Sequence, residues 1–173
     1  MMLKVLGAGC ALAILAAAPA GAQGDGTPRL EFAFEEVVKL GAATNVGETA
    51  RGKRNMIPIT GGHFEGPGKN GEGIKGEIIP GGWDWQLARA DGCVEIKADY
   101  MLKTDDGVTI NVINTGVLCG GPGMAPQPVR THPVFEAPRG KYEWLGQTAF
   151  IGTLEMADPA EGPAVKIRFY KAV

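Results

Sequence analysis

The sequence predicts an all-β fold, either an antiparallel barrel or a β-sandwich. Short segments alternate apolar and polar residues, which is the period of a half-buried strand. The chain contains 27 glycines, which separate these segments at short intervals, and no segment shows a long helical period. Short strands joined by glycine-rich turns are typical of both architectures. The expected strands cover residues 30–39, 53–65, 74–88, 93–104, 108–118, 129–136, 145–156 and 164–172.

The first 22 residues have the pattern of a secretory signal peptide. Lys4 precedes an uncharged apolar run over residues 5–18, and Ala20-Gly21-Ala22 supplies the small residues that a signal peptidase recognises. The run is shorter than the roughly 20 apolar residues of a transmembrane helix. We therefore expect cleavage after Ala22 and a periplasmic or secreted product. A short tail over residues 23–29 then precedes one barrel domain over residues 30–173.

The remaining chain of about 150 residues is long enough for one domain with its own core. Loss of the signal peptide takes the formal net charge from −2 to −3, and no basic cluster is present. This composition excludes a surface for nucleic-acid phosphates. No second apolar run is long enough to span a membrane. We expect a small-molecule ligand as the partner, and the oligomeric state stays open.

A β-hairpin is predicted over residues 93–119. Alternation places Val94, Ile96, Ala98, Tyr100 and Leu102 on one face of the first strand. A three-residue loop, Asp105-Asp106-Gly107, with glycine in the left-handed position closes the hairpin. Directly opposed residues then have numbers that sum to 212, so that Tyr100 faces Val112 and Ala98 faces Asn114.

The same register places Cys93 opposite Cys119. These are the two cysteines that remain after signal-peptide cleavage, and disulfides persist in exported proteins. We predict that they form a disulfide; the alternative is two free thiols that lie close by chance. A two-residue turn at Asp106-Gly107 would shift the register by one residue and break the shared apolar face.

Motifs of common enzyme classes are absent from the sequence. It has no Gly-x-Ser-x-Gly, no phosphate-binding loop and no dinucleotide-binding glycine pattern after a strand. His63 and His132 are the only histidines, and neither has metal-ligand spacing to another histidine or a cysteine. We expect neither a bound metal nor a cofactor.

One polar and aromatic region remains, "MIPITGGHFEGP" followed by "EIIPGGWDWQ". In each run an apolar strand is interrupted by Gly-Gly. Paired glycines in a strand mark a bend, a bulge or the close approach of another backbone or a ligand. Two bends in neighbouring strands would curl the sheet at one level, which suits barrel closure. We favour the corner over the ligand site.

Asp84 lies between two tryptophans, and alternation alone does not decide where it points. Trp83 and Trp85 share one face, and Asp84 and Gln86 share the other. If Asp84 faces the interior, it enters a low-dielectric environment and needs a partner such as Arg54 or Tyr100. If it faces outward, the tryptophans fill the barrel. The preferred interpretation is that Asp84 caps a bend at the barrel mouth. His63 and Glu65 share a face in the preceding strand and carry the same ambiguity.

Four ordered blocks of sequence resemble the domain-of-unknown-function 3237 family. They are "GETARGKRNMIPITGGHFEGP", "GEIIPGGWDWQ", "DYMLKTDDGVTINVINTG" and "PVFEAPRGKYEWL". The resemblance extends from about Leu30 to Val173 and implies a small antiparallel β-barrel of the lipocalin-like, calycin type, with about eight strands. The biochemical role of the family is largely unassigned.

The resemblance also implies which residues occupy the motif positions of the family. They are Arg54, Gly61, Gly62, Glu65, Gly66, Pro67, Gly81, Gly82, Asp84 and Trp85. Trp83 stands where a small residue is expected, so we expect it to narrow the cavity. The export signal and the disulfide are additions to the family pattern.

The first functional hypothesis is an exported barrel that binds a small, largely apolar molecule. Barrels of about eight strands enclose one such ligand. Tyr100, Asn114 and Arg54 would orient its polar end, with Trp83 and Trp85 near the mouth. The apolar walls would be Val94, Ile96, Tyr100, Val112, Phe150, Ile167 and Phe169. The alternative is a filled core without a cavity.

The second hypothesis is a cofactor-independent isomerase, lyase or cyclase. Asp84 or Glu65, with a pKa raised by burial, would act as the general base. Arg54, Tyr100 or His63 would stabilise the resulting oxyanion.

A third class of function, a structural module of the cell envelope, is disfavoured by the absence of repeats. The segment 120–128, GGPGMAPQP, is either a lid or a long surface connection.

Overall fold

The computed structural model describes residues 26–120 and 129–173. The predicted signal peptide and nearly all of the segment 120–128, considered above as a lid or surface connection, lie outside the described residues. The strands are β1 Leu30–Leu40, β2 Thr44–Thr49, β3 Gly52–Gly66, β4 Ile74–Ala88, β5 Val94–Thr104, β6 Thr109–Leu118, β7 Val129–Glu136, β8 Phe150–Met156 and β9 Ala164–Ala172. A short helix α1, Trp144–Gln147, precedes β8, and a 3-10 turn, Pro159–Glu161, precedes β9.

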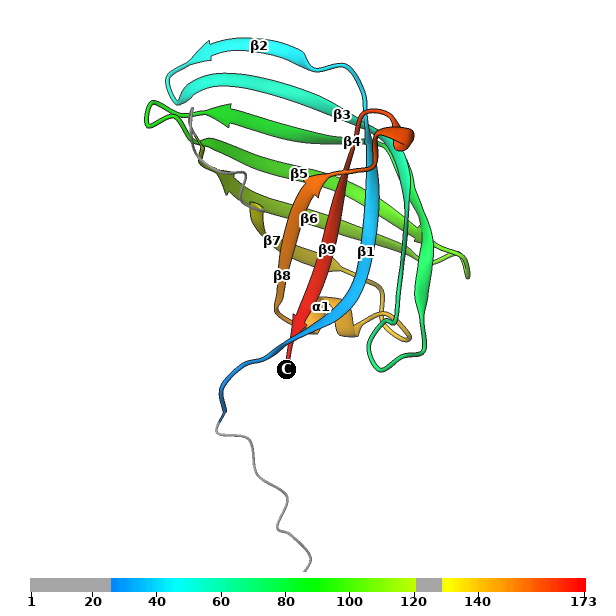
Figure 1. Ribbon diagram of the computed structural model, residues 1–173. Coiled ribbons are helices and arrows are strands. Elements are labelled where there is room, and N and C mark those ends of the chain that lie inside the picture. Colours follow the sequence, from blue (N-terminus) through cyan, green and yellow to red (C-terminus); the bar gives the residue numbers. More distant parts are fainter. Residues whose placement is uncertain (1–25, 121–128) are drawn as a thin grey trace, which may run out of the picture.

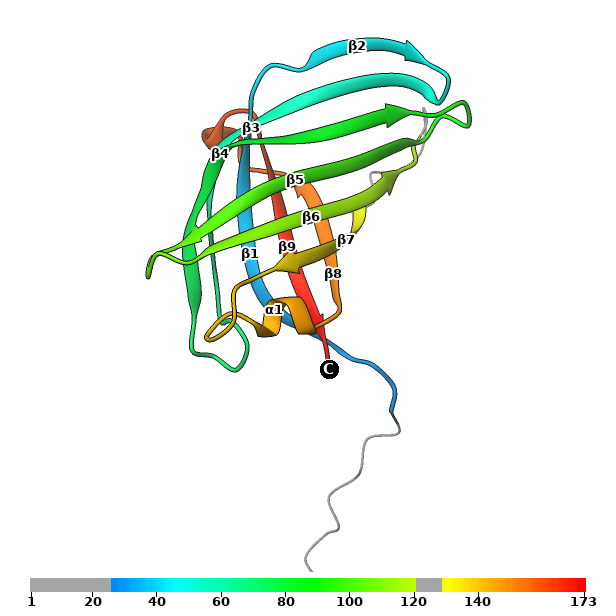
Figure 2. The same ribbon diagram turned by 180° about the vertical axis from the view of Figure 1, so that it is seen from behind.

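The strands form a closed antiparallel barrel, as Figures 1 and 2 show. Their order is β1-β9-β8-β7-β6-β5-β4-β3, and β1 pairs with β3 to close the ring. β2 is an extra strand that pairs only with the first part of β3. The predicted all-β barrel of about eight strands is therefore confirmed. Closure leaves the ring without free edges.

Two local features differ from the sequence prediction. The strand expected over residues 145–156 starts only at Phe150, and the residues before it form α1. This helix carries Trp144 and Leu145 into the core at one end of the barrel, where the Trp144 ring packs 5.8 Å from that of Phe150. β2 was not predicted, because its residues are nearly all exposed and show no apolar alternation.

The Gly-Gly corners are confirmed. The pairing of β3 with β4 shifts between Ile59 and His63, and that of β4 with β5 shifts between Ile79 and Trp83. Gly61 and Gly81 have φ angles of 136° and 115°, in the region that favours glycine. β3 and β4 both bend along their length (Figure 1), and β3 changes its partner on this side from β2 to β1 close to the first glycine pair.

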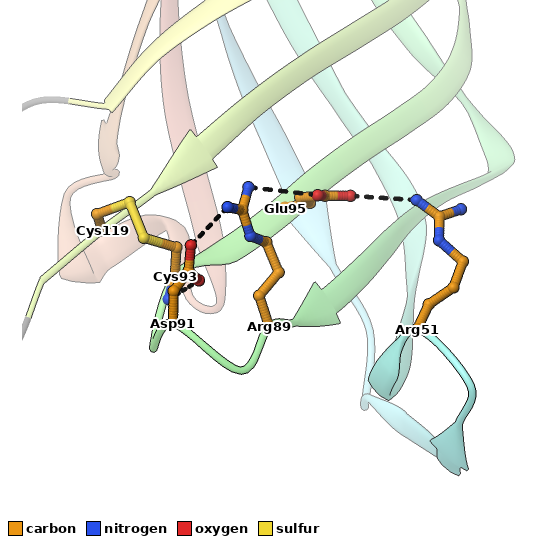
Figure 3. Close-up of polar contacts among 6 residues, drawn as sticks. All are labelled: Arg51, Arg89, Asp91, Cys93, Glu95 and Cys119. Atoms are coloured by element: carbon orange, nitrogen blue, oxygen red, sulfur yellow. Dashed lines mark hydrogen bonds and ion pairs between the residues drawn. A yellow bond between two sulfur atoms is a disulfide. The ribbon is translucent and has the colours of Figure 1, made fainter.

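The predicted hairpin register is confirmed. Tyr100 pairs with Val112 and Ala98 pairs with Asn114. Gly107 has a φ of 86° in the loop, as expected. At the far end of the hairpin the sulfur atoms of Cys93 and Cys119 lie 2.08 Å apart, which is bonding distance (Figure 3). The oxidised state of this pair in the mature protein stays a prediction.

A chain of ion pairs lies beside these cysteines on the outer surface (Figure 3). Glu95 is 3.6 Å from Arg51 and 3.4 Å from Arg89, and Arg89 also contacts Asp91. These groups are partly exposed, so each pair contributes little to stability. They connect the β2–β3 turn with the β4–β5 turn at the end of the barrel that carries the cysteine pair.

The core occupies the end of the barrel that α1 covers. Its aromatic cluster is formed by Phe34, Phe64, Phe135, Phe150 and Phe169, with ring centroids 4.9 to 5.9 Å apart. These five side chains are at most 4% exposed.

Among the described residues no helix has the length and apolar character to cross a membrane.

Gly82, at the second corner, is one of the positions where neighbouring atoms leave no space for a side chain. A Cβ there would lie 2.5 Å from the Cβ of Tyr100 and 2.7 Å from the carbonyl oxygen of Asp99. We therefore expect Gly82→Ala to lower the free energy of unfolding by ~1–3 kcal/mol. Gly120→Ala is the control, because nothing lies within 4 Å of its added Cβ. Urea denaturation of both variants checks this; equal stability would show that the corner relaxes freely.

Candidate functional site

The end of the barrel away from α1 is hollow and holds the candidate site. A cavity of about 300 Å³ lies inside, within the size range of small-molecule sites. Its polar groups come from Asp84, Gln86, Tyr100 and Asn114. The apolar lining consists of Val38, Leu40, Ile57, Ile59, Ile96, Ala98, Leu118, Val129, Leu154, Met156, Val165 and Ile167.

Strand register places the polar groups of this cavity side by side. Asp84, Ala98 and Asn114 are directly opposed across β4, β5 and β6, so their side chains point to the same face. Ala98 is small and leaves space between the carboxyl group and the amide. The rim residues Leu118 and Met156 are 45% and 74% exposed, which places the mouth of the cavity at this end.

Asp84 faces the interior, and both tryptophans face outward. Its Oδ2 accepts a hydrogen bond of 2.9 Å from Gln86 Nε2, and its Oδ1 accepts one of 3.1 Å from the backbone N–H of Lys97. Burial raises the pKa of Asp84, and the two hydrogen bonds oppose this rise. Asp84 thus joins β4 to β5 and also presents a carboxyl group with a raised pKa to the cavity.

Tyr100 crosses the barrel at the base of the cavity. Its hydroxyl group bonds Oε1 of Glu36, although β5 and β1 are not neighbours in the sheet. Glu36 is 1% exposed, and its Oε2 has no hydrogen-bond partner among the described residues. Burial raises the pKa of Glu36 to about 8, despite the opposing hydrogen bond from Tyr100. Burial, and then the charge of Glu36, raises the pKa of Tyr100 well above its ordinary value.

Asn114 supplies a second unused acceptor. Its side chain is 3% exposed, and Oδ1 has no hydrogen-bond partner in the described part of the chain. A buried amide oxygen without a donor is unfavourable by about 1–3 kcal/mol. This oxygen is enclosed by protein atoms, so its cost is borne by the fold itself.

The structure brings together only some of the residues that the sequence singled out. Asp84, Tyr100 and Asn114 line one cavity. Arg54 does not join them, because it lies on the outer face with its guanidinium 5.6 Å from the centre of the Trp85 ring. The partners of Asp84 are Gln86 and the Lys97 backbone, not Arg54.

The other predicted residues also lie outside the cavity. Trp83 is 48% exposed on the outer face, so it does not narrow the interior as expected. His63 and Glu65 are exposed on the outer face of β3, beyond the first corner. Of the expected apolar walls, Ile96 and Ile167 line the cavity, whereas Val112, Phe150 and Phe169 belong to the filled core.

Glu36 is the site residue that sequence reasoning missed. It stands between Phe34 and Val38 on the alternation that faces the interior, in the segment LEFAFEEVVKL. An acidic residue on the apolar phase of a strand is the signal that could have identified it.

The described lining of the cavity contains no lysine, arginine or histidine. No group of three or more metal-binding side chains occurs within residues 26–120 and 129–173.

Together the fold and the site define a closed antiparallel barrel that is filled at one end and hollow at the other. The chain belongs to the family described as "Protein of unknown function (DUF3237)", whose sequence model matches residues 28–172. The resemblance noted in the sequence is thereby confirmed.

Relatives of known structure share this barrel. A UPF0311 protein from Rhodopseudomonas palustris is 36% identical over 141 residues, which cover 73% of this chain and 89% of the relative. The crystal structure of a conserved protein of unknown function from that species matches with a TM-score of 0.72 and 31% identity, over 85% of this chain and 99% of the other. A β-barrel-like protein from Acinetobacter baumannii matches with a TM-score of 0.71 and 33% identity, over 85% and 97% of the two chains.

A more distant relative has a named activity. A hydroalkoxylation enzyme from Penicillium herquei is 27% identical over 126 residues, covering 73% of this chain and 74% of that protein.

The buried acid makes stability depend on pH. The folded-state pKa of Glu36 is about 8 against an ordinary value of 4.5, so the folded state binds this proton more tightly than the unfolded state. The resulting contribution to the free energy of unfolding is complete below pH 4.5 and is lost as the pH rises to about 8. Its size is on the order of a few kcal/mol. We expect Glu36→Gln to remove that decline. Urea denaturation at pH 5 and pH 8 checks it, and an equal decline in both proteins would contradict it.

Proposed function

We propose that this protein binds one small, largely apolar molecule in the hollow end of the barrel. The observation that carries the proposal is the cavity itself, whose walls are mostly apolar and include polar side chains of Asp84, Gln86 and Asn114. Concave, mostly apolar sites with few polar groups are typical of small-molecule binding. A core that only stabilised the fold would be filled, as the end next to α1 is.

A second candidate function is cofactor-independent acid–base catalysis in the same cavity. Asp84 would act as the general base, because burial raises its pKa and so makes its carboxylate a stronger base. Glu65, the alternative base, lies on the outer face and is not retained. The hydroalkoxylation enzyme of Penicillium herquei supports a reaction of this kind. Adding a hydroxyl group across a double bond removes a proton from oxygen and delivers one to carbon, so it requires no redox cofactor.

We also propose that the mature protein is exported and carries the Cys93–Cys119 disulfide. Support comes from the signal-peptide pattern over residues 1–22 and from the bonding distance between the two sulfur atoms. Cys93 and Cys119 flank the pair Val94 and Leu118, and Leu118 belongs to the cavity rim. A disulfide here would hold the end of the β5–β6 hairpin at the mouth of the site.

Binding is tested by native mass spectrometry of the protein purified gently from its own source. We expect a bound small molecule of defined mass, which is lost under denaturing conditions. The denatured mass also tests the disulfide, because oxidation removes two hydrogens. An unliganded mass under every growth condition would count against a resident ligand, and a fully reduced mass would contradict the disulfide.

Asp84→Asn separates binding from catalysis. With the recovered molecule as substrate, we expect turnover to fall by about 10²-fold or more while the midpoint of urea denaturation is retained, since the amide cannot accept the proton. Glu65→Gln on the outer face is the matched control and should retain turnover. If Asp84→Asn lowers affinity and the wild type shows no chemistry, the protein is a binder. If it unfolds the protein, Asp84 has a structural role.

A further inference from the structure

Asp84 is the one charged side chain in the described lining of the cavity, and it forms no ion pair with any described residue. Two cations of the neighbouring strands, Arg54 and Lys97, line a separate hollow on the outer surface. Buried charges in proteins are normally paired with an opposite charge or bound to a metal. The interior of the barrel therefore holds a negative charge whose partner the described residues do not supply.

The hydrogen bonds of Asp84 stabilise its ionised form without neutralising it. Both carboxyl oxygens accept from neutral donors, Gln86 Nε2 at 2.9 Å and the backbone N–H of Lys97 at 3.1 Å. Such donors favour the carboxylate over the carboxylic acid and oppose the effect of burial on its pKa. A carboxylate held in this way attracts a cation into the cavity and repels an anion.

A bound molecule can reach this carboxylate. Asp84 and Gln86 are both partly exposed, whereas the unpaired oxygens of Glu36 and Asn114 are enclosed. Ala98, directly opposite Asp84 on β5, carries only a methyl group and leaves space beside the carboxyl group. Because Gln86 directs Nε2 at Asp84, its Oε1 remains available, and no described residue donates to it. The two side chains thus offer acceptors to one group that has more than one N–H.

A protonated amine fits this arrangement better than other polar groups. Its N–H groups can donate to Asp84 and to Gln86, and its positive charge compensates the carboxylate. A hydroxyl group could donate but would leave the negative charge in place. A metal ion would need further ligands, and no group of three or more metal-binding side chains occurs within the described ranges. The aliphatic walls of the cavity fit an apolar body attached to the amine.

We infer that the cavity selects a hydrophobic amine, whose ammonium group pairs with Asp84 and donates a second hydrogen bond to Oε1 of Gln86. The apolar part of the molecule lies along the aliphatic walls toward the mouth. This inference rests on the proposed binding function and assigns it a chemical class.

Four naphthalene probes of similar size and different charge test this class at neutral pH. We expect 2-naphthylmethylamine, a cation, to bind about 10- to 100-fold tighter than the neutral 2-naphthalenemethanol, since a hydrogen bond between charged groups is stronger than one to a neutral donor. The neutral 2-methylnaphthalene should bind no tighter than the alcohol, and the anion 2-naphthoate should bind weakest. Calorimetry on the intact protein measures all four affinities.

The outcomes separate the inference from the binding function. If the alcohol or 2-methylnaphthalene binds the wild type as tightly as the amine, or if 2-naphthoate binds tightest, the inference is overturned while the binding function stands. If none of the four probes binds, the proposed binding function fails and the inference fails with it.

Asp84→Asn assigns the ion pair. It should lower the affinity for the amine to that for the alcohol and leave the affinity for 2-methylnaphthalene unchanged. Glu65→Gln is the matched control, because it removes one negative charge from the outer face of the barrel. It should retain the preference for the amine. A preference that survives Asp84→Asn, or that disappears in Glu65→Gln, would overturn the role given to Asp84.

An NMR measurement on the wild type keeps the inference testable should Asp84→Asn not fold. The methylene group beside the bound ammonium should show nuclear Overhauser contacts to the methyl group of Ala98, which lies opposite Asp84. Contacts to Leu118 and Met156 at the exposed rim instead would place the ammonium group in water and contradict the ion pair.

Discussion

The hydrogen bond between Tyr100 and Glu36 separates the two halves of this barrel. On one side the interior is filled by five phenylalanines and closed by Trp144 and Leu145 of α1. On the other side the interior is hollow and lined mainly by aliphatic side chains. Tyr100 belongs to both sets, because its ring packs on the core and also lines the cavity. A polar contact between two non-adjacent strands thus sets the depth of the cavity.

The glycine corners make this contact possible. Gly82 packs against Tyr100, because a Cβ at this position would lie 2.5 Å from the Cβ of the tyrosine. The absence of a side chain at the corner therefore lets β4 pass close to Tyr100. Gly62 similarly lets β3 approach β1, since a Cβ there would lie 2.0 Å from the carbonyl oxygen of Val37. The bends turn both long strands around the interior and bring β3 against β1. Barrel closure and the position of the site have the same origin.

The architecture could be predicted from the sequence because it depends on local patterns. Alternation, glycine pairs and the numbering rule of the β5–β6 hairpin each involve residues within about 30 positions of one another, and each agrees with the structure. The site depends on contacts between strands that are distant in sequence. Tyr100 and Glu36 are separated by 64 positions, so no local pattern joins them. Arg54 was one of two partners considered for Asp84, but it lies with Trp85 on the outer face, whereas Asp84 lines the cavity.

The placement of Glu36 is unfavourable for stability and therefore informative about function. Burying a carboxyl group with one oxygen unpaired lowers stability at neutral pH, and an apolar residue at this position would continue the alternation of Phe34 and Val38. Positions where a sequence departs from its own local pattern are where functional sites are expected. Glu36 contacts Tyr100, which lines the same cavity as the second buried acid, Asp84, and the amide of Asn114. Asp84 is compensated by its hydrogen bonds from Gln86 and the Lys97 backbone, whereas Glu36 and Asn114 each retain one oxygen without a partner among the described residues. Polar groups kept at this cost around one hollow favour a functional role for the hollow over a purely structural one.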